Sequence, residues 1–153
     1  MSDCPAISPE RTEMSETTAR PHWQIGQVAD RTELSIKTIR HYDEVGLVTP
    51  SARSTGGFRL YTDDDIARLL VIRRMKPLGF TLAEMKELLD ALDTLADPHS
   101  ASGQHTRAAA VVHELRAKAE DSCAKLRRQL AYAEEFTELL TARIDDQQSA
   151  ETR

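Results

Sequence analysis

From Thr106 to Ile144 the chain contains neither proline nor glycine, and alanine, leucine, glutamate, arginine and lysine dominate. This composition favours one unbroken helix, and its 39 residues would span roughly 58 Å at about 1.5 Å per residue. The part of the chain before it is too small to cover a helix of that length. The stretch therefore constrains the fold more than any other, because much of the helix must stand away from the rest of the protein.

Small and apolar side chains recur along this helix at steps of three and four residues, which is typical of a coiled-coil seam. An exposed seam of this length needs a partner helix, and the simplest partner is a second copy of the chain. A folded-back hairpin is not expected, since no turn residue interrupts the stretch. The predicted dimerisation residues are Val112, Leu115, Ala119, Leu126, Leu130, Ala133, Leu140 and Ile144, with Ser122 and Thr137 as polar members of the seam.

An earlier segment has the pattern of two short helices joined by a tight turn. Thr32 and Glu33 would form the turn, and Leu34 would fill the gap between the helices. Ser35 is suited to cap the second helix, because its hydroxyl can accept a hydrogen bond from an unpaired backbone N–H of the first turn. Gly46 would end that helix, where a residue free to adopt positive φ is favoured.

The second helix has one apolar side and one polar side. Ile39 and Val45 are predicted to face inward. A helix that presents donors and aromatic edges on its other side can enter the major groove of DNA. The residues predicted to face outward are Ser35, Lys37, Thr38, Arg40, His41 and Tyr42.

Alternating apolar and polar residues on both sides of the turn Ser54–Gly57 predict a β-hairpin, or wing. Arg53, Arg59 and Tyr61 would line its outer surface and reach the sugar-phosphate backbone. Phe58, at the end of the turn, could stack on sugars.

Two further helices follow the hairpin. Thr62 with Asp65, and Thr81 with Glu84, both match the spacing of a capping box at a helix start. Pro77 and Gly79 would separate the two helices.

Several of these elements, taken in order, resemble the winged-helix DNA-binding domain of the MerR family of bacterial transcription regulators. The resemblance rests on IGQVA…LSIKTIRHYDEVGLV…R…GGFRLYTDDDIARL…RRMKPLGFTLAEMKELL, from Ile25 to Leu89. Phe58 departs from the usual tyrosine of the wing, and His41 stands where a tyrosine is common.

The resemblance implies a mainly α fold: a winged helix-turn-helix domain with a small β-hairpin wing, followed by a long helix that pairs with its copy as an antiparallel coiled coil. It implies that Arg73, Arg74 and Lys76 contact phosphates from a second, helical wing. It also implies a homodimer on an inverted repeat in promoter DNA. Such a dimer would bend and untwist an overlong spacer so that RNA polymerase engages both promoter elements.

The expected organisation is a disordered tail over 1–21, a DNA-binding domain over 22–92, a linker over 93–105, the dimerisation helix over 106–145 and a flexible tail over 146–153. No segment reads as a secretory signal or a membrane span, so we expect a cytoplasmic, nucleoid-associated protein without a membrane partner.

The formal net charge of −5 would disfavour DNA binding if it were evenly spread. However, residues 21–80 hold nine basic and seven acidic residues. The positive balance therefore coincides with the predicted DNA-binding surface. Because the excess is small, binding should need two such surfaces and should depend strongly on salt.

No cofactor and no metal site are expected, because the resemblance implies cysteines at the start of the long helix and in a loop after it in metal-sensing members, and a cysteine cluster after the helix in redox-sensing members, and these cysteines are missing here. Cys4 and Cys123 do not form a disulfide framework. Two alternatives stay open for Cys123 beside a role as a small buried side chain: an inter-subunit disulfide, and a cross-dimer metal site with His105 or His113.

Two rival functions remain at this point: an architectural DNA-bending protein, and a coiled-coil interaction protein that does not bind DNA. An enzyme is not expected, since no arrangement of catalytic residues is evident.

Overall fold

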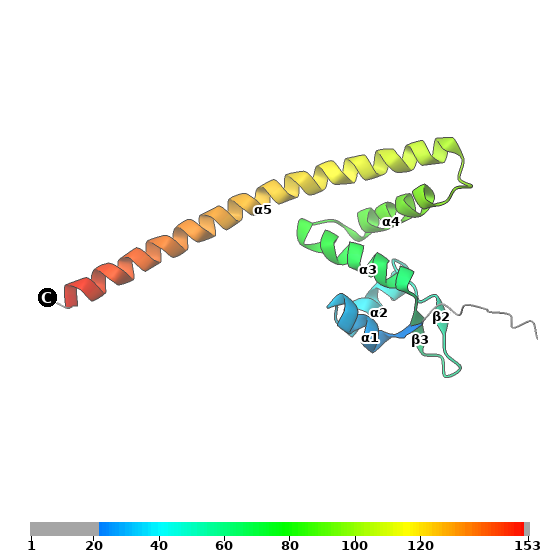
Figure 1. Ribbon diagram of the computed structural model, residues 1–153, viewed down its shortest axis with the longest axis horizontal. Helices are drawn as coiled ribbons and strands as arrows, with labels where there is room; N and C mark the ends of the chain where they lie inside the picture. The colour runs from blue at the N-terminus through cyan, green and yellow to red at the C-terminus, as the bar shows by residue number, and fades with distance from the viewer. Residues whose placement is uncertain (1–21, 152–153) are drawn as a thin grey trace, which may run out of the picture.

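Two short helices, a small sheet and two longer helices precede one very long helix in the computed structural model, which describes residues 22–151 (Figure 1). The predicted tail over 1–21, with Cys4, lies outside the described residues, as do residues 152 and 153. The expected mainly α fold with a small wing and a long C-terminal helix is confirmed. We call residues 23–96 the head and residues 126–151 the stalk.

The sheet has three antiparallel strands in the order β1-β3-β2. β2 (Ala52–Arg53) and β3 (Arg59–Tyr61) form the expected wing, and β1 (Trp23–Gln24) adds a third strand that the sequence did not predict. Trp23 lies opposite Tyr61 in this pairing. The indole N–H of Trp23 also donates to the Asp63 carboxylate at 2.7 Å, which ties the first strand to the helix after the wing.

The helix-turn-helix consists of α1 (Ile25–Thr32) and α2 (Ile36–Glu44). The predicted cap is confirmed: the Thr38 backbone N–H donates to Ser35 Oγ at 3.0 Å. Glu33 lies between the helices with φ of 54°, and Gly46 follows α2 with φ of 71°. Both residues adopt the left-handed conformation at the end of a helix. At Gly46 this conformation has no steric cost, because glycine has no Cβ.

Between α2 and β2 the chain forms a buried loop. Leu47 and Val48 are both buried in the core, and their backbone N–H groups donate to the Tyr42 carbonyl at 2.9 and 3.2 Å. Burial of these side chains takes the chain inward, so the strand begins only at Ala52.

α3 (Asp63–Met75) leads through the short 3-10 turn η1 (Lys76–Leu78) to α4 (Leu82–Ala96). Both predicted capping boxes are present, at Thr62 with Asp65 and at Thr81 with Glu84. Asp65 is itself buried, and its carboxylate also accepts hydrogen bonds from the backbone N–H and the hydroxyl of Ser51. The cap of α3 therefore also anchors the loop that enters the wing.

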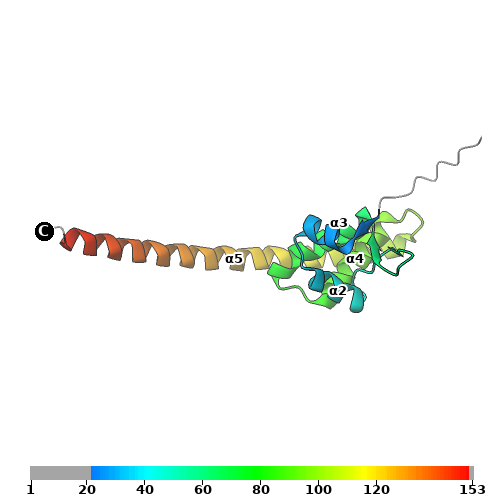
Figure 2. The ribbon, with the colours of Figure 1, turned by 90° about the horizontal axis from the view of Figure 1, so that it is seen from below.

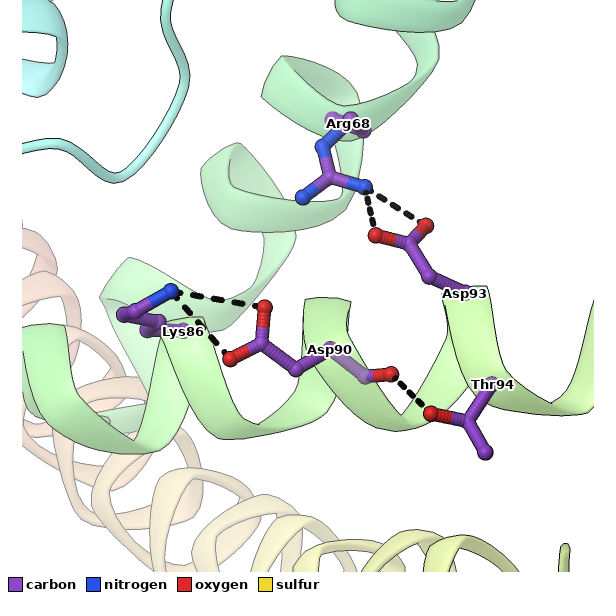
Figure 3. A network of polar contacts seen from close by, with 5 residues as sticks. All are labelled: Arg68, Lys86, Asp90, Asp93 and Thr94. Atoms are coloured by element: carbon purple, nitrogen blue, oxygen red, sulfur yellow. Dashed lines mark hydrogen bonds and ion pairs between the residues drawn. The ribbon is translucent and has the colours of Figure 1, made fainter. Parts of the chain in front are cut away.

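Polar contacts hold α4 against its neighbours. Figure 3 shows Arg68 of α3 reaching Asp93 of α4, with Nη1 2.6 Å from both carboxylate oxygens. Lys86 and Asp90 form an ion pair along α4 at 3.2 Å. On another side of α4, Glu84 pairs with Lys118 of the long helix. These contacts join α3, α4 and the first part of the long helix into one unit.

One apolar core runs through the head and reaches the first third of the long helix. It is built from α1, α2, α3 and α4, with the wing and the buried loop closing it. The fully or nearly buried members are Val28, Ile39, Tyr42, Leu47, Val48, Tyr61, Ile66, Leu69, Ile72, Met75, Phe80, Met85, Leu89 and Leu115.

α5 (Ser102–Glu151) is 50 residues long. The expected linker over 93–105 is wrong, because α4 continues to Ala96 and α5 already begins at Ser102. The Ala101 backbone N–H donates to the Gln104 side chain at 3.1 Å, and this bond starts α5 earlier than the glycine-containing sequence suggested. The expected flexible tail from residue 146 is likewise helical as far as Glu151.

The predicted seam divides into two parts. Leu115 and Ala119 pack against the core of their own head, and Val112 is half-buried. From Leu126 onward the helix leaves the head, and Figure 2 shows the stalk extending alone. The exposed seam side chains there are Leu126, Leu130, Ala133, Leu140 and Ile144. Within the described residues, no helix is long and apolar enough to cross a membrane.

Candidate nucleic-acid interface

The outer face of α2 carries the exposed cations that the sequence predicted there. Lys37, Arg40 and His41 are exposed. Ser35 and Thr38 lie on the first turn, where their hydroxyls are 2.8 Å apart and form part of the helix cap. α2 therefore presents two basic side chains and one imidazole toward solvent from a helix whose start is fixed by a cap.

Tyr42 does not belong to this face, and the expectation that it faces outward is wrong. Its side chain is only 3% exposed, and burial raises the pKa of its hydroxyl. Ile39 and Tyr42 are three residues apart, so they share one side of the helix. Val45, expected to face inward, is exposed because it lies past the last residue of α2.

The tip of the wing is a tight loop held by its own hydrogen bonds. The Gly57 N–H donates to the Ser54 carbonyl at 2.8 Å, and the Ser54 N–H donates to the Phe58 carbonyl at 2.9 Å. Arg53 Nη1 donates to the Gly57 carbonyl at 3.1 Å. Gly57 has φ of 78°, a conformation that a Cβ would strain. This loop exposes Phe58 at its tip, with 70% of its surface accessible.

Arg59, on the central strand, is held by a residue of α2. Its Nε lies 2.6 Å from the Asp43 carboxylate, and the Asp43 side chain is only 13% exposed. This hydrogen bond raises the pKa of the Arg59 guanidinium. The pair uses Nε, and a guanidinium has further N–H donors on its two terminal nitrogens. Asp43 thus links the wing to α2 and orients Arg59.

Three predicted residues from two different elements line one hollow. Arg40 comes from α2, and Phe58 and Arg59 come from the wing. The first turn of α1 also lines the hollow, and a Cβ added at Gly26 would meet nothing within 4 Å. Two guanidinium groups beside a helix N-terminus favour an anion. The hollow is therefore suited to a phosphate of a nucleic-acid backbone.

Tyr61 was expected on the outer surface of the wing, and this expectation is wrong. Its side chain is fully buried, and burial is the main cause of the raised pKa of its hydroxyl. The hydroxyl has no hydrogen-bond partner among the described residues. Tyr61 lies opposite Trp23 where β3 pairs with β1 and belongs to the apolar core, so it stabilises the head and cannot contact DNA directly.

The cations predicted for a second contact lie at the end of α3 and in η1. Arg73, Arg74 and Lys76 are all exposed. Arg73 forms an ion pair with Glu33, the left-handed residue between α1 and α2. This pair joins the two predicted contact surfaces across the head.

Asp43 and Glu33 are the residues that sequence reasoning missed. Both are acidic, whereas the predicted DNA contacts are mainly basic or hydrogen-bond-donating side chains. Only the fold shows that each one holds an arginine of the predicted interface. No sequence signal pairs Asp43 with Arg59, because strand pairing and helix packing bring them together.

Within residues 22–151, no three histidine, cysteine or acidic side chains gather in a way that could hold a metal ion. His105 Nε2 lies 3.0 Å from the Asp97 carbonyl, and Cys123 is half-buried.

Comparison with known families gives two matches that together cover residues 23–153. The model described as "MerR HTH family regulatory protein" matches residues 23–92, and the model described as "MerR, DNA binding" matches residues 66–153.

Individual relatives agree with these matches. The heavy metal-dependent transcription regulator 2 of Rhizobium meliloti (strain 1021) is 32% identical over 116 residues, which are 76% of this chain and 70% of that protein. The nodulation protein NolA of Bradyrhizobium sp. (strain NC92) is 37% identical over 81 residues, or 53% of this chain. The chain spans about a third of the length of NolA, 34%.

Among solved structures, the fold is similar to that of HiNmlR, a MerR family regulator lacking the sensor domain, which was crystallised bound to promoter DNA. The TM-score is 0.57 at 22% identity, and the match covers 72% of this chain and 79% of that one. This likeness concerns the fold alone. The family matches, which span the head and α5, show that this chain belongs to the MerR family of helix-turn-helix regulatory proteins.

Proposed function

We propose that this protein is a transcription regulator that binds a specific promoter sequence as a homodimer. α2 would enter the major groove and read base edges with Lys37, Arg40 and His41. The wing, with Arg53, Phe58 and Arg59, would contact the adjacent sugar-phosphate backbone. Arg73, Arg74 and Lys76 would reach phosphates further along the duplex.

The observation that carries this proposal is the hollow shared by α2 and the wing. Arg40 and Arg59 line it together with the start of α1, and Asp43 orients Arg59 at 2.6 Å. This arrangement ties the proposed recognition helix to the proposed backbone contact of the wing. This arrangement supports docking on a duplex, because register on DNA is set by phosphate contacts and sequence is read by base contacts.

Dimerisation is supported by the bare seam of the stalk. Leu126, Leu130, Leu140 and Ile144 are between 43% and 58% exposed on one side of the helix. Burying them against a second stalk would provide the main apolar contact area between two copies. A two-fold pair of heads would then bind the two halves of an inverted repeat.

We further propose that binding deforms the DNA. Membership of the family favours a promoter with an overlong spacer, which the dimer would bend and untwist so that RNA polymerase engages both promoter elements. Bending a site of this size costs on the order of 1–6 kcal/mol, which contacts at both heads would offset.

The test is a binding measurement on genomic DNA fragments selected with the purified chain, followed by footprinting. We expect a discrete protected inverted repeat. Arg40→Ala should weaken binding to that site by about 1–3 kcal/mol, if Arg40 contacts a base edge. Arg107→Ala removes an exposed arginine of α5, outside the proposed interface, and serves as the matched control that should leave affinity unchanged.

Two other outcomes would replace this function with a different one. Diffuse protection without a preferred site would favour an architectural DNA-bending protein. If the chain has no measurable affinity for any duplex, Arg40→Ala has no affinity to reduce. This outcome would favour a coiled-coil interaction protein.

A further inference from the structure

Lys118 of α5 contacts the start of α4 in two ways. Its ammonium forms an ion pair with Oε1 of the Glu84 carboxylate, whose other oxygen, Oε2, accepts the Thr81 backbone N–H at 2.8 Å within the capping box of α4. The ammonium also lies 5.1 Å from the centroid of the Phe80 ring, within the range of a cation–π contact. Lys118 therefore contacts the residues on both sides of the α4 cap. We call Lys118, Glu84 and Phe80 the clasp.

The clasp lies at the open end of a helical hairpin. α4 and α5 are joined at the other end by a connector over residues 97–101 (Figure 1). The connector holds the two helices together only at that end, so contacts at the open end decide the angle between them. Leu115 and Ala119, on either side of Lys118 in the sequence, pack against the core of the head. Because apolar contacts are non-directional whereas hydrogen bonds have a preferred geometry, the clasp is suited to fix the direction of α5.

The clasp also lies next to the cations of the proposed second DNA contact. η1 carries the exposed Lys76 and ends two residues before Phe80, and the last turn of α3 holds the exposed Arg73 and Arg74. η1 itself lies beside α5. A change in the angle between α4 and α5 would therefore move these cations relative to α5.

We propose that Lys118 is a positioning residue, which fixes the angle between the head and α5 and thereby sets the spacing between half-sites that the dimer accepts. This inference rests on the proposed homodimer on an inverted repeat. In such a dimer the two heads are connected through their α5 helices, so the angle at each head determines the separation and the relative rotation of the two DNA contacts. Each additional base pair of spacer turns the second half-site by roughly 35° about the duplex axis. One fixed angle therefore matches one spacer length best.

The clasp should act on geometry rather than on stability. The side chains of Lys118 and Glu84 are both partly exposed, and solvent screens an ion pair of this kind. The apolar contact of Leu115 with the core does not depend on the clasp, so the head and α5 should stay in contact without it. Loss of the clasp should therefore loosen the angle between the head and α5 while the head stays folded.

The experiment measures the affinity of full-length variants for duplexes with the same two half-sites and spacers that differ by one or two base pairs. The spacer preference is the ratio of the dissociation constants for a neighbouring spacer and for the best one. Lys118→Met keeps an unbranched side chain of similar length but removes the ammonium, and it should reduce the spacer preference by roughly three- to tenfold. Lys118→Arg should retain the preference, because a guanidinium can pair with the carboxylate and lie over the ring.

Glu84→Gln tests the same contact from α4. Its amide oxygen can still accept the Thr81 N–H, so the cap persists while the charge is lost. We expect the same reduction in spacer preference as for Lys118→Met, and little further reduction in the double variant, because both changes remove one interaction. Lys86→Met is the matched control: Lys86 pairs with Asp90 of its own helix, and its loss should leave the spacer preference unchanged.

A lysine that only stabilised the head would change the affinity for every spacer by the same factor. An unchanged spacer preference in Lys118→Met, whether or not its overall affinity falls, would therefore overturn the positioning role and leave the proposed DNA binding intact. A wild-type chain that binds a single half-site, or that binds duplexes of every spacer length equally, would overturn the proposed paired binding and this inference together.

Discussion

The head and the stalk use the same apolar residue types for opposite purposes. In the head, Leu69 and Ile72 of α3 are fully buried by their own chain. In the stalk, Leu130 and Ile144 remain more than half exposed. The head therefore buries its apolar side chains within one chain, whereas the apolar side chains of the stalk can be buried only against a second helix. Stability of the head and association of the stalk should therefore respond to different substitutions.

The largest expected effect concerns the core of the head. Tyr42→Ala should lower the free energy of unfolding by about 3–5 kcal/mol, because it leaves a large cavity at a buried aromatic position. Val45→Ala, three residues further on and 45% exposed, is the control and should change it by less than about 0.5 kcal/mol. Urea denaturation followed by circular dichroism measures both. Equal losses at the two positions would contradict the observed orientation of α2.

The next effect separates the stalk from the head. Leu140→Ala should weaken the dimer by roughly 30- to 1,000-fold, since each of the two copies loses apolar burial worth on the order of 1–2 kcal/mol. The unfolding of the head should not change. Leu139→Ala is the matched control, because Leu139 is similarly exposed but lies off the seam. Sedimentation equilibrium gives the dissociation constants of the dimer. Identical values for the two variants would contradict the proposal that the seam forms the dimer contact.

A smaller loss is expected at the buried cap. Asp65→Asn should reduce the stability of the head by about 1–3 kcal/mol, because the carboxylate accepts hydrogen bonds from Ser51 and from the Thr62 backbone. Glu87→Gln, which removes an exposed carboxylate of α4, is the control. Thermal unfolding of both variants distinguishes a hydrogen-bond network at residue 65 from a general effect of removing a carboxylate.

A pH-dependent contribution is expected where α4 meets α5. The hydrogen bond from Lys118, followed by that from the Thr81 backbone, lowers the pKa of Glu84 below its ordinary value of 4.5. Because the folded-state pKa is the lower one, this contribution is complete above 4.5 and is lost as the pH falls through the folded value. Stability of wild type relative to Glu84→Gln should therefore shrink only at acidic pH. A constant difference from pH 7 to pH 3 would contradict the ion pair.

The smallest effect is expected at Tyr61. Tyr61→Phe removes a buried hydroxyl that has no partner among the described residues, so stability should be unchanged or slightly higher, and DNA affinity should be unaffected. Competition between wild type and variant for one labelled duplex measures the second quantity. A large loss of DNA affinity in the variant would contradict the conclusion that Tyr61 does not contact DNA.

Local chemistry made the helix starts predictable. Ser35, Thr62 and Thr81 act within three residues of themselves, so the pattern of a hydroxyl followed by an acceptor or a backbone N–H could be identified in the sequence. The long helix was equally clear, because absence of proline and glycine is also a local property. These features required no knowledge of tertiary packing.

Features set by distant contacts were not predictable in the same way. β1 has two residues and forms only because Trp23 pairs with Tyr61, 38 positions later. That pairing buries Tyr61, which an alternating pattern in an isolated hairpin would leave outside. Tyr42 was assigned by its chemistry as a hydrogen-bond donor, although its spacing from Ile39 already indicated the buried side. The ion pair of Arg59 with Asp43 depends on how α2 packs against the sheet.

The central claim is that the head folds by itself whereas the stalk needs a second copy of the chain. It is tested most directly by measuring the mass of the protein–DNA complex that forms on one duplex. We predict that analytical ultracentrifugation will find two copies of the chain on a fragment that contains one inverted repeat, and that Leu140→Ala will weaken this complex. One copy per duplex, bound with the affinity of wild type and unaffected by Leu140→Ala, would contradict the account.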